Sequence, residues 1–348
     1  MKIRINVLSA ATSVKGQGVG SAYSEQLALI KESEAFDISI NSYKGDADIY
    51  HIHTVNLGYR LRMNHRHINV VYVHFIPSHN DGSIKLWKPI DYIFRKYSEG
   101  LYKKADELVV VNPYFISDLE KLGIDKDRIT YIPNFVSKDN FFKIDNQLIV
   151  DTKIKYHIPL DKFVVLGCGQ IQTRKGFDDF VNTAKENPEM FFVWVGGFSF
   201  GKITDGYSKY KKLLQNLPQN MINIPIIDRE LMNNIFNCID VLFMPSYLEL
   251  FPMTILEVAN ISKPILLRDL ELYKPILSDK YLVGNDPKSF GDQLKKLQTN
   301  PSYYKEYSKR SEEISNIYNK EYISKLWVEY YERIYQKWNK KKLANKIQ

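Results

Sequence analysis

Short β-branched runs alternate with helical patterns along almost the whole chain, and this alternation constrains the fold more than any other feature. Repeated strand–helix–strand units form right-handed crossovers, which build a parallel sheet with helices on both faces. The runs fall into two series. We expect strands of the first series at 3–8, 36–40, 48–53, 68–75, 107–111 and 129–132. We expect strands of the second series at 163–167, 191–196, 222–227, 241–244, 264–267 and 281–283.

The two series predict two doubly wound α/β domains. With 348 residues, the chain is long enough for two domains of about 100–200 residues each. A polar stretch separates the series, so we place the domains at 1–140 and 159–318, joined by a linker at 141–158. Ligands of such folds bind at the carboxyl ends of the strands, which predicts a site in a cleft between the domains.

Cysteine content and hydropathy indicate the cellular compartment in which the protein resides. The two cysteines, Cys168 and Cys238, are too few for a disulfide framework or a zinc cluster, which favours a reducing compartment. No stretch approaches the roughly 18 apolar residues of a membrane-spanning helix. The first residues run directly into a strand and lack the apolar core of a signal peptide. We therefore expect a cytoplasmic protein.

Two glutamates form the strongest candidate constellation. Glu249 and Glu257 follow the expected strand 241–244, and Pro252 between them suits the first turn of a helix. Glu249 would then lie in the loop at the strand's carboxyl end and Glu257 in the second helical turn. Both could face the cleft, where a carboxylate binds a hydroxyl pair or stabilises developing positive charge. Spacing by itself favours a plainer interpretation, with one ordinary surface glutamate and one ordinary helical glutamate.

A cationic turn is the second candidate. Arg174 and Lys175 lie side by side between the expected strand 163–167 and a helical pattern at 177–185. Two cations beside the free N–H groups of a helix N-terminus suit a diphosphate. A solvated turn is the alternative.

A glycine-rich loop follows the first strand. Gly18 and Gly20 lie in the segment 15–21, which resembles a phosphate-cradling loop. It lacks both the dinucleotide-binding spacing and the terminal Lys-Ser/Thr of a P-loop, so an ordinary flexible turn stays open.

Histidines cluster at the ends of two strands of the first series. His51 and His53 share one strand, and His74 ends another. Metal binding has no supporting pattern of further ligands, so we expect no metal. A hydrogen-bonded histidine in the cleft, His74, and a buried one, His51, are the favoured interpretations.

The net charge of +8 is concentrated in two segments. Residues 60–104 hold nine Lys or Arg against three acidic residues, and residues 320–348 hold eight against three. Within the first segment, 84–97 mixes Trp, Tyr and Phe with Lys and Arg, which suits an anionic bilayer interface. A buried helix with solvated charges is the alternative. Nucleic acid is not indicated, because no recognition motif accompanies the charge.

Together these motifs resemble the retaining glycosyltransferases of family 4, which have the GT-B fold. The resemblance rests on the carboxylate pair, the Arg-Lys-Gly turn, the Gly196-Gly197 turn and the run 131–136, and it covers nearly the whole chain. It implies two Rossmann-like doubly wound domains facing each other across a cleft, with the terminal helix 319–342 packed back on the first domain.

The resemblance also implies roles for the candidate residues. The donor would be UDP-glucose or UDP-galactose, held mainly by the second domain without a metal or other cofactor. Lys175, helped by Arg174, would neutralise the departing diphosphate. Glu257 would bind the ribose, Glu249 would contact the transferred sugar, and His74 would help to hold that sugar from the first domain. The other donor-binding residues implied are Gly18, Gly20, Gly197, Phe251 and Thr254. Retention of configuration would give an α-linked product.

The acceptor is implied by a narrower likeness. Segments 169–176, 197–206 and 268–273 resemble bacterial enzymes that add a second sugar to a glycosyl-diacylglycerol. The implied acceptor is a membrane glycolipid such as monoglucosyl-diacylglycerol, and the enzyme would lie peripherally on the inner face of the cell membrane. The residues expected to face the anionic membrane or the acceptor are Arg60, Arg62, Arg66, Lys85, Trp87, Lys88, Arg95 and Lys96.

Two positions depart from the family, and several alternatives stay open. Gln170 stands where many members have Arg, and Phe135 where Gly is usual. A glycosyltransferase of polysaccharide or teichoic-acid synthesis would share the same motifs. A non-enzymatic membrane-binding protein would leave the carboxylate pair unexplained, and a dinucleotide-dependent oxidoreductase would need a fingerprint loop that this sequence lacks.

Overall fold

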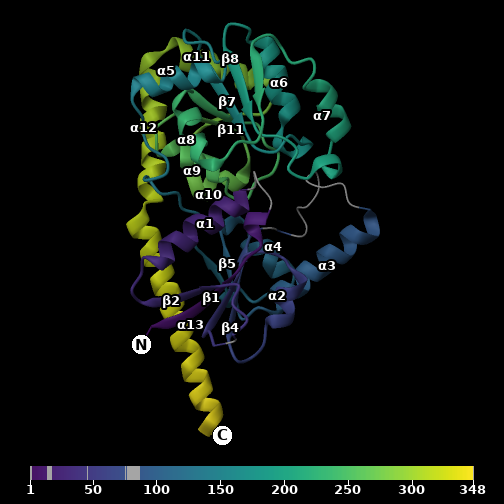
Figure 1. Ribbon diagram of the computed structural model, residues 1–348, viewed down its shortest axis with the longest axis vertical. Coiled ribbons are helices and arrows are strands. Elements are labelled where there is room, and N and C mark those ends of the chain that lie inside the picture. The colour runs from purple at the N-terminus through teal and green to yellow at the C-terminus, as the bar shows by residue number, and fades with distance from the viewer. Residues whose placement is uncertain (1, 14–17, 45, 75, 77–86, 348) are drawn as a thin grey trace.

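The computed structural model describes residues 2–13, 18–44, 46–74, 76 and 87–347, and it contains two parallel six-stranded sheets, one above the other (Figure 1). The first sheet comprises β1 (Ile3–Leu8), β2 (Phe36–Ile40), β3 (Ile49–Ile52), β4 (Ile68–Val73), β5 (Glu107–Val110) and β6 (Ile129–Tyr131). The second comprises β7 (Val164–Cys168), β8 (Phe191–Val195), β9 (Met221–Ile224), β10 (Val241–Met244), β11 (Ile265–Arg268) and β12 (Leu282–Gly284). These strands lie where the alternation predicts them, so the α/β prediction is confirmed.

The central strands are apolar because both of their faces are covered. All residues of β4 and β8 are buried, as are those of β5 and β10. Near-continuous apolar runs are typical of parallel strands packed between two layers of helices.

The strand order of the second sheet determines where its loops meet. The order is β12-β11-β10-β7-β8-β9, so the direction of winding reverses between β7 and β10, which pair through Val165 with Val241 and Leu166 with Leu242. At such a switch point the loops that follow the two strands diverge and leave a crevice for a ligand. These loops are 169–176 and 245–252, the cationic turn and the loop that carries Glu249.

The helices connect the strands and cover the sheets. In the first half they are α1 (Gly18–Lys31), α2 (Leu57–Arg62), α3 (Lys88–Lys104) and α4 (Ile116–Lys121). In the second half they are α6 (Phe177–Glu186), α7 (Tyr207–Leu213), α8 (Arg229–Asn237), α9 (Met253–Ala259), α10 (Lys274–Leu277), α11 (Pro287–Thr299) and α12 (Pro301–Ile317). The segment 141–158 is not simply polar chain, because it contains α5 (Asn146–Lys155), capped by Asp145.

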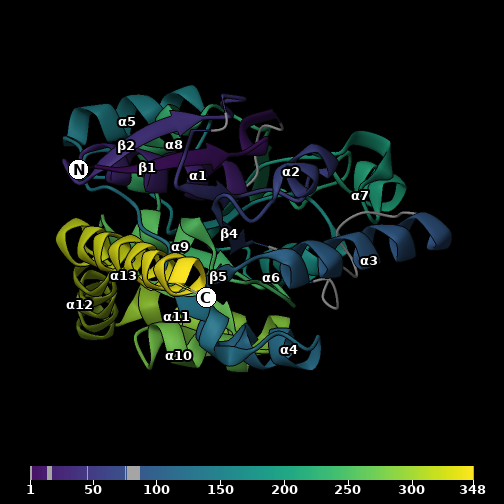
Figure 2. The same ribbon diagram turned by 90° about the horizontal axis from the view of Figure 1, so that it is seen from below.

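A long final helix ties the two halves together. α13 (Lys320–Ile347) follows α12 down one side of the molecule and passes the first sheet (Figures 1 and 2). Its Tyr331 hydroxyl lies 2.5 Å from His51 Nδ1 and accepts a hydrogen bond of 3.1 Å from the Gln26 amide. Trp327 is buried beside them. In the described part of the chain, this and every other helix lacks the length and apolarity needed to span a bilayer.

Candidate active site

The loop after β10 places Glu249 directly on the cationic turn. Lys175 Nζ donates to Glu249 Oε1 at 2.5 Å, and Arg174 Nη1 lies 3.9 Å from Oε2 while donating to the Leu248 carbonyl at 2.8 Å. Gly176 makes this approach possible: its φ is +68°, and a Cβ there would lie 2.2 Å from the Pro245 carbonyl oxygen. Only glycine tolerates both the dihedral and the contact.

Neighbouring cations keep the Glu249 carboxylate ionised. Glu249 is 6% exposed, and burial alone would raise the pKa of its carboxyl. The charges of Lys175 and Arg174 outweigh burial and hold the pKa of Glu249 below its ordinary value. The structure therefore keeps an anion and two cations at the switch point of the second sheet.

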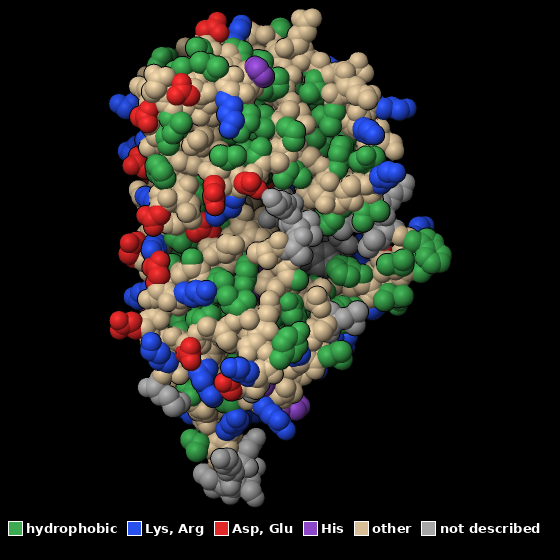
Figure 3. Space-filling view, viewed as in Figure 1, with side chains coloured by type: hydrophobic (Ala, Val, Ile, Leu, Met, Phe, Trp, Pro, Cys, Tyr) green, Lys and Arg blue, Asp and Glu red, His purple; other side chains and the backbone are tan. Residues whose placement is uncertain are grey.

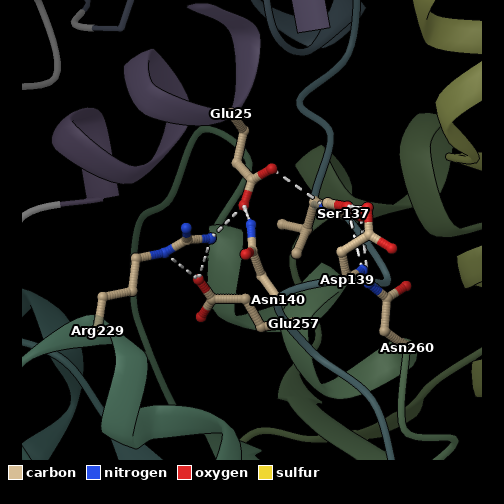
Figure 4. A network of polar contacts seen from close by, with 8 residues as sticks. Glu25, Ser137, Asp139, Asn140, Arg229, Glu257 and Asn260 are labelled. Carbon is tan, nitrogen blue, oxygen red and sulfur yellow. Dashed lines mark hydrogen bonds and ion pairs between the residues drawn. The ribbon is translucent and has the colours of Figure 1, made fainter. Parts of the chain in front are cut away.

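Glu257 lies in a different electrostatic setting. It is buried on α9, and its Oε1 accepts from Arg229 Nη2 at 3.2 Å and from Nε at 3.3 Å. Burial raises the pKa of Glu257, and the Arg229 charge opposes this shift without cancelling it. Arg229 also donates to Glu25 of α1 at 2.7 Å, so one guanidinium joins carboxylates from both halves of the chain (Figure 4).

Glu25 extends this network into the segment that joins the two halves. Its Oε2 accepts from the Ser137 backbone N–H at 3.1 Å, and its Oε1 accepts from the Asn140 amide at 3.0 Å (Figure 4). Sequence reasoning missed both Arg229 and Glu25. The one sequence signal for Arg229 is its position at the start of a helix soon after β9, at the carboxyl edge of the sheet. This signal is weak, because many residues occupy such positions without binding a ligand.

Cys168, at the end of β7, is influenced by several of the predicted donor-side residues. Burial raises the pKa of its thiol to about 12, the Glu257 charge acts in the same direction and the Lys175 charge opposes it. A hydrogen bond with Thr254 also involves this thiol. Lys175, Thr254 and Glu257 therefore all act on one side chain, and Glu249 contacts the first of them.

Two glycines allow the backbone to close around this position. Gly169 and Gly196 have φ values of +132° and +138°, and a Cβ at Gly196 would lie 2.0 Å from the Gly169 carbonyl oxygen. The next residue, Gly197, accepts a hydrogen bond from the Ile171 N–H at 3.0 Å. Gly197 thus lies beside the loop that carries the cationic turn.

Phe251 supports the loop that carries Glu249. Its ring is buried and lies edge-on to Tyr318, with ring centroids 5.1 Å apart. Its backbone carbonyl accepts a hydrogen bond of 2.9 Å from the Asn134 amide of the first half.

The first half presents a neutral imidazole cluster. His74 follows β4, and its Nε2 lies 3.4 Å from His53 Nδ1, while His51 contacts Tyr331 as described above. Burial lowers the pKa of His51 to about 3 and also lowers the pKa values of His53 and His74. The predicted burial of His51 is confirmed, but its hydrogen bonding is incomplete, because its Nδ1 contacts Tyr331 while its buried Nε2 has no hydrogen-bond partner among the described residues.

The glycine-rich loop leads into α1. Gly18 and Gly20 lie in the first turn of that helix, and a Cβ at Gly20 would lie 3.1 Å from the Ala11 carbonyl oxygen. Residues 14–17 fall outside the described residues. Among the described residues, no group of His, Cys, Asp and Glu is arranged to hold a metal ion.

The predicted basic aromatic surface lies on α3 and around it. The amino end of α3 projects from the body, and hydrophobic side chains gather there (Figure 3). Trp87 is 73% exposed, and Lys88 and Arg66 are also exposed. Lys85 lies outside the described residues. The other exposed apolar side chains of this end are Ile90, Tyr92 and Ile93.

Several cations of this surface have partners within the chain. Arg95 pairs with Asp91 at 2.7 Å and Lys96 with Glu99 at 2.9 Å. The Arg60 guanidinium lies 5.3 Å from the centroid of the Tyr97 ring.

Arg62 also contacts an aromatic ring of the same half. Its guanidinium lies 4.4 Å from the centroid of the Tyr43 ring and donates to the Ser42 carbonyl. Arg60 and Arg62 therefore hold α2 against its neighbours as well as contributing charge.

Both halves of the chain match known protein families. Residues 25–140 match the family described as Glycosyltransferase Family 4, and residues 151–314 match Glycosyl transferases group 1. The chain is 38% identical to the α-galactosylglucosyldiacylglycerol synthase of Streptococcus pneumoniae, covering 95% of this chain and 90% of that protein. The chain belongs to the family 4 glycosyltransferases. This glycosyltransferase is also 26% identical to the processive diacylglycerol α-glucosyltransferase of Acholeplasma laidlawii, covering 82% of this chain and 84% of that protein.

Solved structures show the fold of this glycosyltransferase. The sucrose-phosphate synthase of Thermosynechococcus elongatus superposes with a TM-score of 0.79 at 15% identity, covering 96% of this chain and all of that chain. HepE of Anabaena, solved in complex with UDP-glucose, gives a TM-score of 0.77 at 11% identity, covering 95% of this chain and all of that chain. The GT-B prediction is therefore confirmed.

Proposed function

We propose that this glycosyltransferase moves glucose or galactose from a UDP-sugar to a membrane glycolipid such as monoglucosyl-diacylglycerol, with retention, so that the product is an α-linked diglycosyl-diacylglycerol. The observation that carries the proposal is the Lys175–Glu249 pair at the switch point, with Glu257 nearby, in a chain related to two diacylglycerol glycosyltransferases. UDP is the expected nucleotide because HepE, which has the same fold, was solved with UDP-glucose.

Each of the site residues would bind a different part of the donor. Lys175 and Arg174 would neutralise the diphosphate as it departs, which lowers the barrier because the charges are already in place in a buried site. Glu257 would accept hydrogen bonds from the ribose hydroxyls, and Glu249 would contact the transferred sugar. His74, a neutral imidazole at the opposite wall, would hydrogen-bond that sugar.

Retention is accounted for by a front-side displacement. The bond between the anomeric carbon and the phosphate oxygen breaks while the acceptor oxygen bonds to the same face of that carbon. The acceptor proton passes to the departing phosphate oxygen, so no protein nucleophile is needed. Because Lys175 and Arg174 supply the positive charge, we expect turnover without a divalent cation, and activity that survives a chelator would support this.

The projecting end of α3 suits an anionic membrane surface. Exposed Trp87, Ile90 and Ile93 can enter the headgroup region, while Lys88 and Lys96 lie near the lipid phosphates. The enzyme would then act as a peripheral protein on the inner face of the cell membrane and take its acceptor without extracting the lipid tails.

Mass spectrometry of the lipid products tests the proposal. The protein is incubated with UDP-glucose or UDP-galactose and vesicles containing monoglucosyl-diacylglycerol, with or without phosphatidylglycerol, and Glu249→Ala serves as the inactive control. We expect one added hexose, formed faster on the anionic vesicles. Transfer to a soluble polysaccharide or teichoic-acid acceptor, with none to the lipid, would instead identify the alternative acceptor class.

A further inference from the structure

The loop that carries Glu249 is held by both halves of the molecule. Its beginning is anchored within the second half, where the Tyr247 N–H donates to the Arg174 carbonyl at 2.8 Å and Arg268 Nε donates to the Pro245 carbonyl at 3.0 Å. The Tyr247 hydroxyl also donates to Asp179 at 2.7 Å.

The end of the same loop is held by two asparagines of the first half. Asn112, just after β5, donates its amide to the carbonyls of Leu250 and Leu272, both at 2.9 Å. Asn134, just after β6, donates its amide to the Phe251 carbonyl at 2.9 Å. The two carbonyls next to Glu249 on its C-terminal side therefore take their hydrogen bonds from the opposite sheet.

Both asparagines are themselves held firmly. They are buried, and the Asn112 side-chain oxygen accepts from the Tyr114 N–H at 3.0 Å. The Asn134 side-chain oxygen accepts from the Tyr72 hydroxyl at 3.4 Å, and the Tyr72 ring lies 4.2 Å from the His74 ring, measured between centroids. A continuous set of contacts thus runs from the histidine cluster to the Glu249 loop.

We infer that Asn112 and Asn134 are positioning residues that place Glu249 from the opposite half of the molecule, an inference that rests on the proposed function. A buried carbonyl needs a donor, and a loop of this kind, just before a helix that begins after Pro252, takes its donors from elsewhere. Without the two amides, the Glu249 end of the loop loses its fixed position while the Lys175 end keeps its anchors. The carboxylate of the donor site is then correctly placed only while the two halves are docked.

Enzyme kinetics distinguishes this role from simple stabilisation. Asn112→Ala and Asn134→Ala should each lower kcat by on the order of tenfold to a hundredfold, since a displacement of about 1 Å can cost that much. The donor KM should change less than threefold, because the diphosphate and ribose contacts remain. The matched control is Asn220→Ala, whose amide donates to three carbonyls of the second half, those of Ala184, Asn187 and Met190. It should lower the melting temperature similarly and leave kcat unchanged.

A double-mutant cycle with Glu249 supplies the decisive readout. In single-turnover assays, Asn134→Ala added to Glu249→Gln should slow transfer far less than Asn134→Ala does alone, because both changes disable the same carboxylate. Effects that multiply, or variants that lose melting temperature but keep kcat, would overturn the inference. Failure of the proposed function has a different signature, since the unaltered protein would then form no lipid product from either UDP-sugar.

Discussion

The two walls of the cleft use the same architecture for opposite electrostatic purposes. Each wall is the carboxyl edge of a parallel six-stranded sheet. On the second sheet, the charges of Lys175 and Arg174 hold the pKa of the buried Glu249 carboxyl below its ordinary value, with Lys175 Nζ 2.5 Å from Glu249 Oε1, whereas burial raises the pKa of Glu257 despite its Arg229 partner. On the first sheet, His51, His53 and His74 are held neutral by burial. A buried ion is tolerated where it is paired, and a buried titratable group without such a partner loses its charge.

The contrast fits the two parts of the proposed donor. The diphosphate is strongly charged and needs cations, whereas the sugar is neutral and would be held by hydrogen bonds, with the neutral His74 imidazole on one side and the Glu249 carboxylate on the other. Substitutions in either wall test this electrostatic difference.

The largest effect is expected at the charged wall. Lys175→Ala should lower kcat/KM by roughly a hundredfold to a thousandfold, because the departing diphosphate loses a preorganised cation. Release of UDP under steady-state conditions measures the loss. Lys209→Ala, which removes an exposed lysine paired with Asp178 at 2.7 Å, is the control and should retain full activity. If the kcat/KM of Lys175→Ala stayed within twofold of that of the unaltered enzyme, the charge of Lys175 would not be needed for sugar transfer.

A smaller effect is expected at the neutral wall. His74→Ala should lower kcat/KM by about tenfold, which corresponds to one lost neutral hydrogen bond. Because burial lowers the pKa of His74, its imidazole stays neutral and the effect should not vary between pH 6 and 8. A loss that grows steeply as the pH falls through 6.5 would show that His74 acts in its charged form and would end the contrast between the walls.

Stability at low pH provides a third test. Burial places the pKa of folded His51 at about 3, so the unfolded chain, with an ordinary histidine pKa near 6.5, binds the proton more readily. The free energy of unfolding therefore keeps its full value above about pH 6.5. It decreases as the pH falls toward 3, by roughly 1.4 kcal/mol per pH unit for one such histidine.

Melting temperatures between pH 8 and 4.5 measure this loss. His51→Gln should make the decrease shallower, and His65→Gln, at an exposed position, serves as the control. An unchanged slope in His51→Gln would mean that His51 is charged in the folded protein.

The smallest effect is expected for membrane binding by the exposed cations around α3. Lys88→Ala should weaken binding to anionic vesicles by about fivefold, since one cation near such a surface contributes roughly 1 kcal/mol. Sedimentation with phosphatidylglycerol vesicles measures the change. Lys305→Ala, exposed on α12 of the second half, is the matched control. Equal losses in the two variants would point to net charge rather than to a defined surface.

Local patterns predicted much of the structure. The strand–helix alternation predicted the twelve strands found among the described residues. It also placed Arg174, Lys175 and Glu249 in loops that follow strands of the second sheet and Glu257 on the helix after one of them, while the preference for these residues as donor-binding groups came from the resemblance to family 4 glycosyltransferases. The helix α5 was not anticipated, because its polar sequence has little of the apolar periodicity that marks a packed helix.

Periodicity and neighbours within a few residues were enough to predict the helices and strands, the parallel α/β class of the sheets and the types of residue that follow the strands. Contacts between the two halves are visible only in the folded molecule: Arg229 meets Glu25, 204 positions away, and Asn112 meets the Leu250 carbonyl, 138 positions away. Such partners leave no local signal, since their proximity depends on how the two sheets lie relative to each other in the folded molecule.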